Sequence, residues 1–372
     1  MHSILNLLFT SAAFITVISV LVFVHEFGHY IIAKWAGVKI ETFSMGFGHE
    51  LWGRTDKSGT RWKISALPLG GYVKMYGDAS EISNAAEDID KLSDEEKTKT
   101  FHYKPLYKKA AIVVAGPLAN FLLTISIFTA FIATSGLPST EPVVGEVIKD
   151  TPAQAAGLQP GDRVLAVDGK KVEVFNDIPH MILTNLGTEI TLTIKRGDNQ
   201  LDVRLIPKQV TEDELGNSYT HPLIGIATKN IRVEEVGVPR AVWEATKATY
   251  GFCTTTLDAV GQIIIGERSF FKTINGPVSM AKMSGHAAEK GPSMFLMVMA
   301  YISANLGLVN LFPIPVLDGG HLLYYAIEVI QGRPLAKRFQ EYGLRIGFAI
   351  VAMLMTSAIF SDIYKWLLTL KG

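Results

Sequence analysis

Four long apolar stretches dominate the pattern of hydrophobic and polar positions along the chain. Each is long enough for an α-helix to cross about 30 Å of hydrocarbon. They run approximately over residues 4–24 (continuing to 35), 110–134, 294–317 and 343–368. The pattern therefore predicts four transmembrane helices. We expect the first to be retained, because no Lys or Arg precedes Lys34 and the positive n-region of a signal peptide is missing.

The segment between the first two apolar stretches has the shorter period of β-structure. Residues 38–76 alternate apolar and polar positions, and Asp56 to Gly59 supplies a hairpin turn. Strand edges that face lipid are not tolerated. We therefore expect a β-sheet or re-entrant hairpin that packs against the helices, followed at 77–105 by an acidic cytoplasmic loop.

The stretch between the second and third apolar segments predicts a small α/β domain over 140–230. A helix is expected from Phe175 to Leu186, and a hairpin from Glu189–Lys195 and Leu201–Ile206. The run from Asp150 to Asp162, with its Gly157 and Pro160-Gly161-Asp162, resembles the bacterial PDZ signature; another small α/β domain is the alternative. A PDZ domain binds an extended peptide as an added strand. The resemblance implies a groove, which a peptide C-terminus would occupy, beside Val144, Gly145, Glu146 and Val147.

These patterns define the expected organisation of the chain. The fold class is a multi-pass α-helical membrane protein with a membrane-associated β-hairpin or sheet and an inserted α/β PDZ domain. The expected segments are the first transmembrane helix at 1–37, the β region at 38–76, the loop at 77–105, the second helix at 106–135, the PDZ domain at 140–230, an amphipathic helical connector at 231–293, the third transmembrane segment at 294–320 and the fourth helix at 340–370.

Composition agrees with a membrane protein that also carries a water-soluble part. The mean hydropathy is +0.25, yet 19% of the residues are charged, and the net charge of zero gives no reason to expect nucleic acid. Lys and Arg are dense between the first and second apolar stretches and recur between the third and fourth. The positive-inside rule places both loops in the cytoplasm, so the two termini and the PDZ domain are expected on the outer side.

Candidate chemistry begins at the end of the first apolar stretch, with His25-Glu26-Phe27-Gly28-His29. On a helix, positions i and i+4 share a face, so both imidazoles can bind one zinc ion. Zinc lowers the pKa of a bound water toward about 7, and Glu26 can accept its proton as the water attacks a carbonyl. Ionisable side chains at membrane depth are costly, which makes a functional site the preferred interpretation.

A catalytic zinc site needs a third protein ligand. Glu41 and Glu50 are the nearest downstream carboxylates, but they fall in the β region. Asp318 is a better candidate, because it follows the helix-breaking Pro313 and Pro315 at membrane depth, where an unpaired carboxylate would be expensive. His321 is a competing ligand, for which a supporting structural role is preferred.

These motifs resemble the site-2 protease family of intramembrane zinc proteases, in a form with one PDZ domain rather than two in tandem. The resemblance is carried by HExxH in the first span, Asn-x-x-Pro-x-Pro-x-Leu-Asp-Gly in the third (Asn310 to Gly319) and the PDZ signature between them. It extends nearly end to end through "GFG" at 46–48, "PLGGYVKM" at 68–75, "AGPLANF" at 115–121 and "NGPVSMA" at 275–281. In "AGPLANF" small residues let helices approach closely, and Asn120 is a further candidate to face the active site.

The resemblance implies a set of roles for these positions. His25, His29 and Asp318 would hold Zn²⁺, and Glu26 would be the base. Asn310 and Asn305 would lie near the substrate backbone, with interhelical hydrogen bonds as the alternative. The β region would hold the substrate as an added strand through Gly46, Phe47, Gly48, Gly70, Gly71 and Tyr72.

The resemblance also implies partners and a location. The substrates would be transmembrane segments of single-pass membrane proteins in the lipid bilayer, of the anti-sigma-factor type or remnant signal peptides. The expected location is the inner membrane of a bacterium, with the termini and the PDZ domain periplasmic. A membrane-anchored PDZ adaptor with a structural metal site is the main alternative, although such a site would not need Glu26. A small transporter is disfavoured, because no inverted repeat pairs the four spans.

Overall fold

The computed structural model of the chain describes residues 2–76, 92–139, 141–183, 187–214, 217–228, 232–267, 273 and 275–369. The chain forms two compact units. One comprises Met1–Ile127 and Asn275–Ile363, and the other comprises Phe128–Ile274 and Tyr364–Gly372. Helix α3 passes from the first unit into the second.

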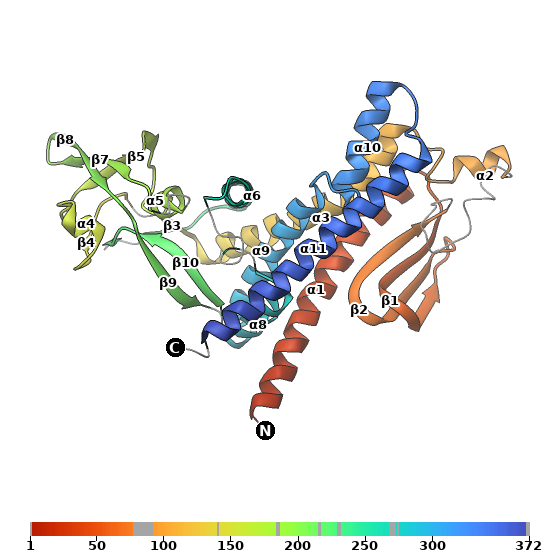
Figure 1. Cartoon of the computed structure of the whole chain (residues 1–372), viewed down its shortest axis with the longest axis horizontal. Helices are drawn as coiled ribbons and strands as arrows, with labels where there is room; N and C mark the ends of the chain where they lie inside the picture. The colour runs from red at the N-terminus through yellow and green to blue at the C-terminus, as the bar shows by residue number, and fades with distance from the viewer. Residues whose placement is uncertain are drawn as a thin grey trace. The chain divides into compact units, whose positions relative to one another are not determined.

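The first unit is built mainly of helices (Figure 1). They are α1 (His2–Trp35), the short α2 (Asp94–Thr98), α3 (Leu106–Ser135), α8 (Pro277–Glu289), α9 (Pro292–Asn310), α10 (Asp318–Gln331) and α11 (Lys337–Thr369). Helices long and apolar enough to cross a membrane span Ile4–Trp35, Leu106–Ser135, Pro292–Asn310 and Arg338–Tyr364. The four predicted apolar helices are therefore present, and their insertion into a bilayer stays a prediction.

The third apolar segment ends earlier than expected, and a further helix follows it. Helix α9 stops at Asn310 and not near Leu317, because the two prolines at 313 and 315 cannot continue a helix that needs their N–H groups. Helix α10 then begins at Asp318. The sequence pattern does not predict a separate helix over these residues.

Strands β1 (Ile40–Thr55) and β2 (Arg61–Met75) form the expected hairpin, which lies beside α1 (Figure 1). The hairpin folds back on itself. Ser44, for example, pairs with Tyr72 on one side and with Lys63 on the other. As a result, residues 71–75 form the outer border of the folded sheet, next to residues 42–45.

Glycines make this fold-back possible. Gly46, Gly48 and Gly70 have φ angles of 86°, 85° and 91°, a region that other residues rarely adopt. At the opposite end, the Asp56 carboxylate closes the turn by accepting hydrogen bonds from the backbone N–H groups of Ser58 and Thr60. The glycines and the Asp56 turn thus fix the backbone path at the two ends of the hairpin.

An aromatic cluster fixes the hairpin against α1. Phe43 is 1% exposed, its ring centroid lies 4.5 Å from that of Trp62, and both rings contact Tyr30 of α1. Aromatic pairs at such distances stabilise by roughly 0.5–1.5 kcal/mol beyond their buried area. The β region is thus anchored to the helix that carries the HExxH motif.

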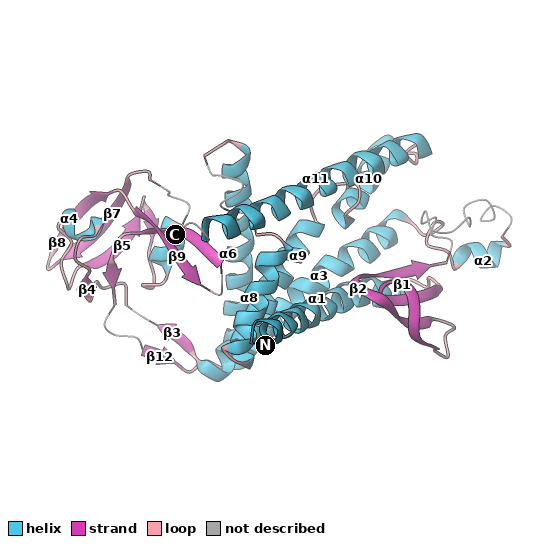
Figure 2. Cartoon of the chain, turned by 60° about the horizontal axis from the view of Figure 1, so that its bottom comes forward, coloured by secondary structure: helices cyan, strands magenta, loops and turns pink. Residues whose placement is uncertain are grey.

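The second unit contains all the remaining described strands; strands are drawn in magenta in Figure 2. Its elements are β3 (Leu137–Ser139), β4 (Glu146–Val147), α4 (Pro152–Ala155), β5 (Arg163–Val167), β6 (Lys170–Lys171), α5 (Asp177–Ile182), β7 (Ile190–Arg196), β8 (Asn199–Leu205), β9 (Lys208–Glu214), β10 (Asn217–Leu223), β11 (Ile226–Ala227), β12 (Arg232–Glu234) and α6 (Val238–Ile264). The order β6-β5-β7-β8 defines its largest sheet in the described residues, and β4 pairs with β11.

The core of this unit agrees with the expected α/β domain. Buried residues of β5 and β7 pack against Ile178 and Ile182 of α5 and against Val144. Helix α5 is shorter than the predicted Phe175–Leu186, and residues 184–186 lie outside the described part of the chain. The predicted hairpin is present as β7 and β8.

Candidate metal centre

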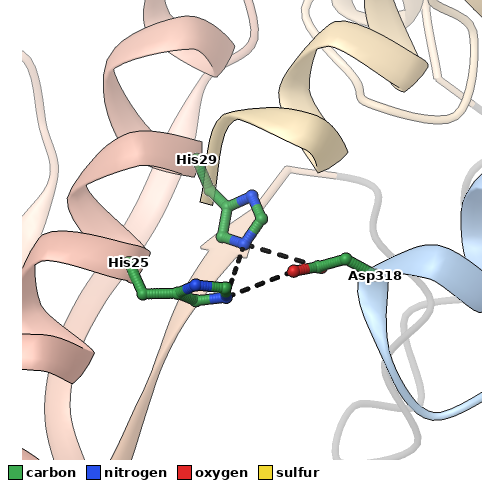
Figure 3. Close-up of side chains that lie close together, drawn as sticks. All are labelled: His25, His29 and Asp318. Carbon is green, nitrogen blue, oxygen red and sulfur yellow. Dashed lines mark hydrogen bonds and ion pairs between the residues drawn. The ribbon is translucent and has the colours of Figure 1, made fainter. Parts of the chain in front are cut away.

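Helix α1 places its two histidines on one face, as a spacing of four residues requires. The Nε2 atoms of His25 and His29 lie 3.2 Å apart, and each side chain is 12% exposed (Figure 3). Both rings point away from the axis of α1 toward the same place. Both Nε2 atoms could therefore bind the same metal ion.

Asp318 is the first residue of α10, and its side chain points toward the two histidines (Figure 3). Its carboxylate lies 3.2 Å from His25 Nε2 through Oδ2 and 3.6 Å from His29 Nε2 through Oδ1 (Figure 3). The chain makes a tight turn just before it. A Cβ on Gly319 would lie 2.3 Å from the carbonyl oxygens of Leu311 and Phe312, so only glycine lets α10 begin there. The turn carries Asp318 back to the histidines.

The three side chains fit a divalent metal ion. Their ligand atoms all lie within 4.8 Å of one another. In a tetrahedral zinc site with bonds of about 2.0–2.1 Å, neighbouring ligand atoms are about 3.3 Å apart. The separations of 3.2, 3.2 and 3.6 Å are close to that spacing. Two imidazoles and one carboxylate form the donor set of many catalytic zinc sites, with a fourth position left for water.

Helix α3 supports both imidazoles from behind. His29 Nδ1 lies 2.8 Å from the carbonyl oxygen of Ile112, to which it donates a hydrogen bond, and His25 Nδ1 lies 3.2 Å from the Asn120 side chain. Gly116 makes this approach possible, because a Cβ there would lie 2.3 Å from His29 Nε2. The first unit therefore brings three segments to the site.

Glu26 lies between α1 and the border of the folded hairpin. The backbone N–H of Val73 donates a hydrogen bond to its carboxylate. A Cβ on Gly71 would lie 3.3 Å from Glu26 Cγ, so the strand runs close to this side chain. The glutamate that follows the first histidine thus faces the strand edge as well as the metal cluster.

The other ligands considered lie outside the cluster. Glu41 pairs with Lys74 at 2.9 Å, and Glu50 pairs with Arg61. His321 is exposed on α10, where its ring packs edge-on to Tyr324. Among the described residues, the metal-type cluster consists of His25, His29 and Asp318.

The candidate substrate residues of the hairpin come together at its corner. The rings of Phe47 and Tyr72 stack with centroids 6.0 Å apart. A Cβ on Gly70 would lie 2.5 Å from Phe47, and Phe47 is 41% exposed. Gly46 and Gly48 flank Phe47, so the two motifs form one surface.

The two candidate asparagines lie on α9, Asn305 within it and Asn310 at its end, and both are half-buried. Within the described residues, neither amide makes a hydrogen bond to another helix. The interhelical hydrogen bonds that were the alternative role for Asn305 and Asn310 are therefore not found among the described residues.

In the second unit, the candidate groove residues occupy and precede β4. Glu146 and Val147 form the strand, and the N–H of Gly145 donates to Ala227. Val144 is buried in the core, at 1% exposure. A bound peptide at this strand stays a prediction.

Two features of the site were not identified as ligand supports from the sequence: the Ile112 carbonyl and Gly116. A backbone carbonyl carries no sequence signal. Gly116 belongs to the small-residue motif "AGPLANF", whose glycine-proline pair marks a helix with an unusual close approach. This motif is the sequence feature from which the role of Gly116 could have been predicted.

A histidine pair four residues apart on a helix, a glutamate after the first histidine and an aspartate from a distant helix define a metallopeptidase type of site. The model of Peptidase family M50 matches residues 13–354. The chain therefore belongs to Peptidase family M50, and it is a metalloendopeptidase of the site-2 protease type. The resemblance seen in the sequence is confirmed.

Named relatives cover almost the whole chain. A protein of Rhizobium meliloti (strain 1021), provisionally named zinc metalloprotease R01501, is 41% identical over 97% of this chain and 98% of its own length. Protease RseP of Yersinia pestis is 30% identical over 96% of this chain and 99% of its own length. Both the enzyme class and zinc as its metal agree with these names.

Solved structures similar to part of the chain are PDZ domains. That of the SdrC-like protein of Listeria monocytogenes is 25% identical and covers 24% of this chain and 90% of its own, with a TM-score of 0.19. That of Listeria innocua is 22% identical, with a TM-score of 0.21. At such scores, the PDZ interpretation rests on the local elements and the signature of residues 150–162.

Proposed function

We propose that this metalloendopeptidase cuts transmembrane segments of single-pass membrane proteins, with zinc held by His25, His29 and Asp318. Anti-sigma factors and remnant signal peptides are the proposed substrate classes. One observation carries the proposal: the convergence of these three ligands at the end of a membrane-length apolar helix. A polar cluster at that depth is costly and is retained where it serves a reaction.

The chemistry of the site divides between the metal and the chain. When bound, zinc supplies a Lewis acid that lowers the pKa of a water molecule and polarises a carbonyl. The side chains of His25, His29 and Asp318 supply neutral and anionic donor atoms, and the resulting charge compensation makes their burial tolerable. The chain itself therefore has to supply a base and a way to hold the substrate.

Glu26 is the proposed base. Glu26 directly follows His25 in the sequence, and its carboxylate can accept a proton from the attacking water. It then hands the same proton to the nitrogen of the leaving amine, so that no further acid is needed. The N–H of Val73 orients the carboxylate through its hydrogen bond.

The folded hairpin is the proposed holder of the substrate. A transmembrane helix hides its peptide carbonyls in its own hydrogen bonds, and these must open before water can attack. Strand addition to a sheet edge replaces the lost bonds. Residues 71–75 form the border of the hairpin beside Glu26, which supports an added strand there, with the Phe47 corner and the amides of Asn305 and Asn310 as further contacts.

The location of the enzyme follows from the distribution of charge. We propose the inner membrane of a bacterium, with the Lys- and Arg-rich loops in the cytoplasm and with both termini and the PDZ domain in the periplasm. The PDZ domain would select substrates, either by binding a newly exposed peptide C-terminus or by excluding proteins with bulky outer domains.

The test is Glu26→Gln, with cleavage of a model transmembrane substrate scored by gel and zinc measured in the same purified protein. We expect cleavage to be lost and zinc to be retained. Glu341→Gln, an exposed glutamate of α11, is the matched control and should cleave normally. Full cleavage by Glu26→Gln would refute the proposal.

A further inference from the structure

The two histidines of the cluster do not receive the same kind of support from α3. His29 Nδ1 lies 2.8 Å from a backbone carbonyl, which can only accept a hydrogen bond. The ring proton of His29 is therefore on Nδ1, and the lone pair of Nε2 is free to bind a metal. His25 Nδ1 instead lies 3.2 Å from Nδ2 of the Asn120 side-chain amide, and the acceptor end of this amide, Oδ1, faces away from the ring.

The orientation of this amide decides which nitrogen of His25 carries the proton. If the NH₂ end faces Nδ1, the ring proton must be on Nε2, where it points at His29 and Asp318 and blocks ligation. If the oxygen faces Nδ1, the ring donates its Nδ1–H, and the Nε2 lone pair is released. The two ends of an amide have nearly the same shape, so either orientation fits the same space.

No competing contact of the Asn120 side chain opposes the second orientation. The residue is 0% exposed, and Oδ1, the end of the amide that faces away from His25, has no hydrogen-bond partner among the described residues, so turning the amide over breaks no other hydrogen bond. A fully buried amide end without a partner is expensive. The only group that sets the orientation in this part of the chain is thus His25.

The backbone of Asn120 is held firmly. Its carbonyl oxygen accepts hydrogen bonds from Thr124 Oγ1 at 3.0 Å and from Ser303 Oγ of α9 at 2.9 Å. Thr124 Oγ1 also lies 3.0 Å from the carbonyl oxygen of Ala300, so its single proton is shared between the two carbonyls. These contacts tie α3 to α9 at the level of the site and fix the main chain from which the Asn120 side chain extends.

We propose that Asn120 is a positioning residue, whose side-chain oxygen accepts the Nδ1–H of His25 and so holds the tautomer that presents Nε2 to zinc. This inference rests on the proposed metal site. Groups that support a metal-bound histidine through its second nitrogen typically change metal affinity by about 10–100-fold when they are removed. Asn120 touches neither the substrate nor the reacting atoms in this role.

The inference is tested by zinc affinity, measured by competition with a chelator on the purified full chain. We expect Asn120→Ala to weaken zinc binding by about 10–100-fold. Asn120→Asp keeps the size and offers only acceptor oxygens, so it should recover most of this loss. A purely structural role predicts no such recovery, because aspartate would add a buried charge.

Thr129→Val is the matched control, since Thr129 lies on the same helix and its hydroxyl is buried without a partner in the described residues. It should bind zinc as the unaltered protein does. Melting of each variant after metal removal reports on folding separately from affinity. If Asn120→Ala fails to fold, the affinity of Asn120→Asp still decides: affinity near that of the unaltered protein supports the inference.

Two results would overturn the inference: unchanged zinc affinity in folded Asn120→Ala, or zinc affinity in folded Asn120→Asp that is about 10–100-fold weaker than in the unaltered protein. The proposed metal site fails in a different way. If Asp318→Ala also leaves zinc affinity unchanged, the ligands themselves are wrong. If Asp318→Ala loses zinc and Asn120→Ala does not, only the positioning role is wrong.

Discussion

Asp362, near the end of α11, accepts a hydrogen bond of 2.9 Å from the backbone N–H of Val278 at the start of α8. The same carboxylate accepts from the N–H of Gly276 at 3.1 Å and from Ser279. The first turn of a helix leaves N–H groups without partners, and a carboxylate satisfies them while favouring the positive end of the helix dipole. The fourth apolar helix is thus bonded to a segment far from it in sequence.

Removing the Asp362 cap should destabilise the first unit. Asp362 is 5% exposed, so Asp362→Ala leaves buried donors without partners. We expect the free energy of unfolding to fall by about 1.5–3 kcal/mol, as for hydrogen bonds to a charged group. Thermal melting in detergent is the measurement, with exposed Asp258→Ala in α6 as the control. Equal melting temperatures for the two variants would show that the cap contributes little.

Gly116→Ala should reduce zinc binding. The added Cβ would lie 2.3 Å from His29 Nε2 and 2.9 Å from His25 Cε1, so both rings must move or α3 must retreat. We expect zinc content after purification to drop well below one ion per chain, with cleavage lost in parallel. Metal analysis decides this.

Gly251→Ala is the matched control for that substitution. Gly251 also lies inside a helix, but its Cβ would meet nothing within 4 Å. Alanine in an open helical position stabilises by roughly 0.5–1 kcal/mol relative to glycine. Normal zinc content in Gly116→Ala would mean that the close approach of α3 is not needed.

Gly46→Ala should impair cleavage and leave zinc in place. Gly46 has a φ of 86°, and a Cβ would lie 2.4 Å from the carbonyl oxygen of Leu67, so the corner of the hairpin must open. Gly59 has the same φ of 86° but open space around it. Gly59→Ala therefore carries only the backbone cost of about 1–2 kcal/mol.

Cleavage of a model transmembrane substrate, compared between these two variants at equal zinc content, is the measurement. A loss in Gly46→Ala alone would support a role for the corner in holding the substrate. Equal activities would argue that the corner is not used in catalysis.

The second unit should lose stability in acid through Asp162. Burial raises the pKa of this carboxyl, but hydrogen bonds from Arg196 and from the N–H of Gln159 outweigh burial and hold the pKa below its ordinary value. A lowered folded-state pKa stabilises above the unfolded value of about 3.9, and this contribution disappears as the pH falls through the folded value. Protection of β7 against hydrogen exchange, corrected for intrinsic rates, should therefore be lower at about pH 3 than at about pH 6.

Arg196→Met should remove that contribution near neutral pH. Asp162 has a side chain only 1% exposed, and without its partner the unfolding free energy of the unit should fall by about 1.5–3 kcal/mol. Arg204→Met, an exposed arginine on β8, is the control. If both variants keep the same protection of β7 at both pH values, the Arg196–Asp162 pair contributes little to stability.

Local sequence patterns predicted the helices and turns whose formation depends on residues close together in the sequence. Apolar length alone predicts helices such as α1, and the period of 3.6 residues places His25 and His29 on one face. The hairpin turn followed from Asp56 to Gly59 for the same reason. Asp318 was favoured because a lone carboxylate at that depth needs compensation, and not because any distance could be inferred.

Other features depend on contacts between distant segments, which one sequence does not encode visibly. The fold-back of β1 and β2 depends on three glycine φ angles acting together. The separate start of α10 depends on how closely Gly319 can approach Leu311. The contact between His25 and Asn120 depends on the rotation of α3 about its axis, which its apolar sequence does not determine.

The order of the three proposed ligands along the chain determines when the metal site can form. Ribosomes make proteins from the N-terminus, so the two imidazoles leave the tunnel long before Asp318 does. A partly made chain carries His25 and His29 but not Asp318, the carboxylate from α10 that completes the cluster. The proposed metal site therefore cannot be complete before α10 has been synthesised.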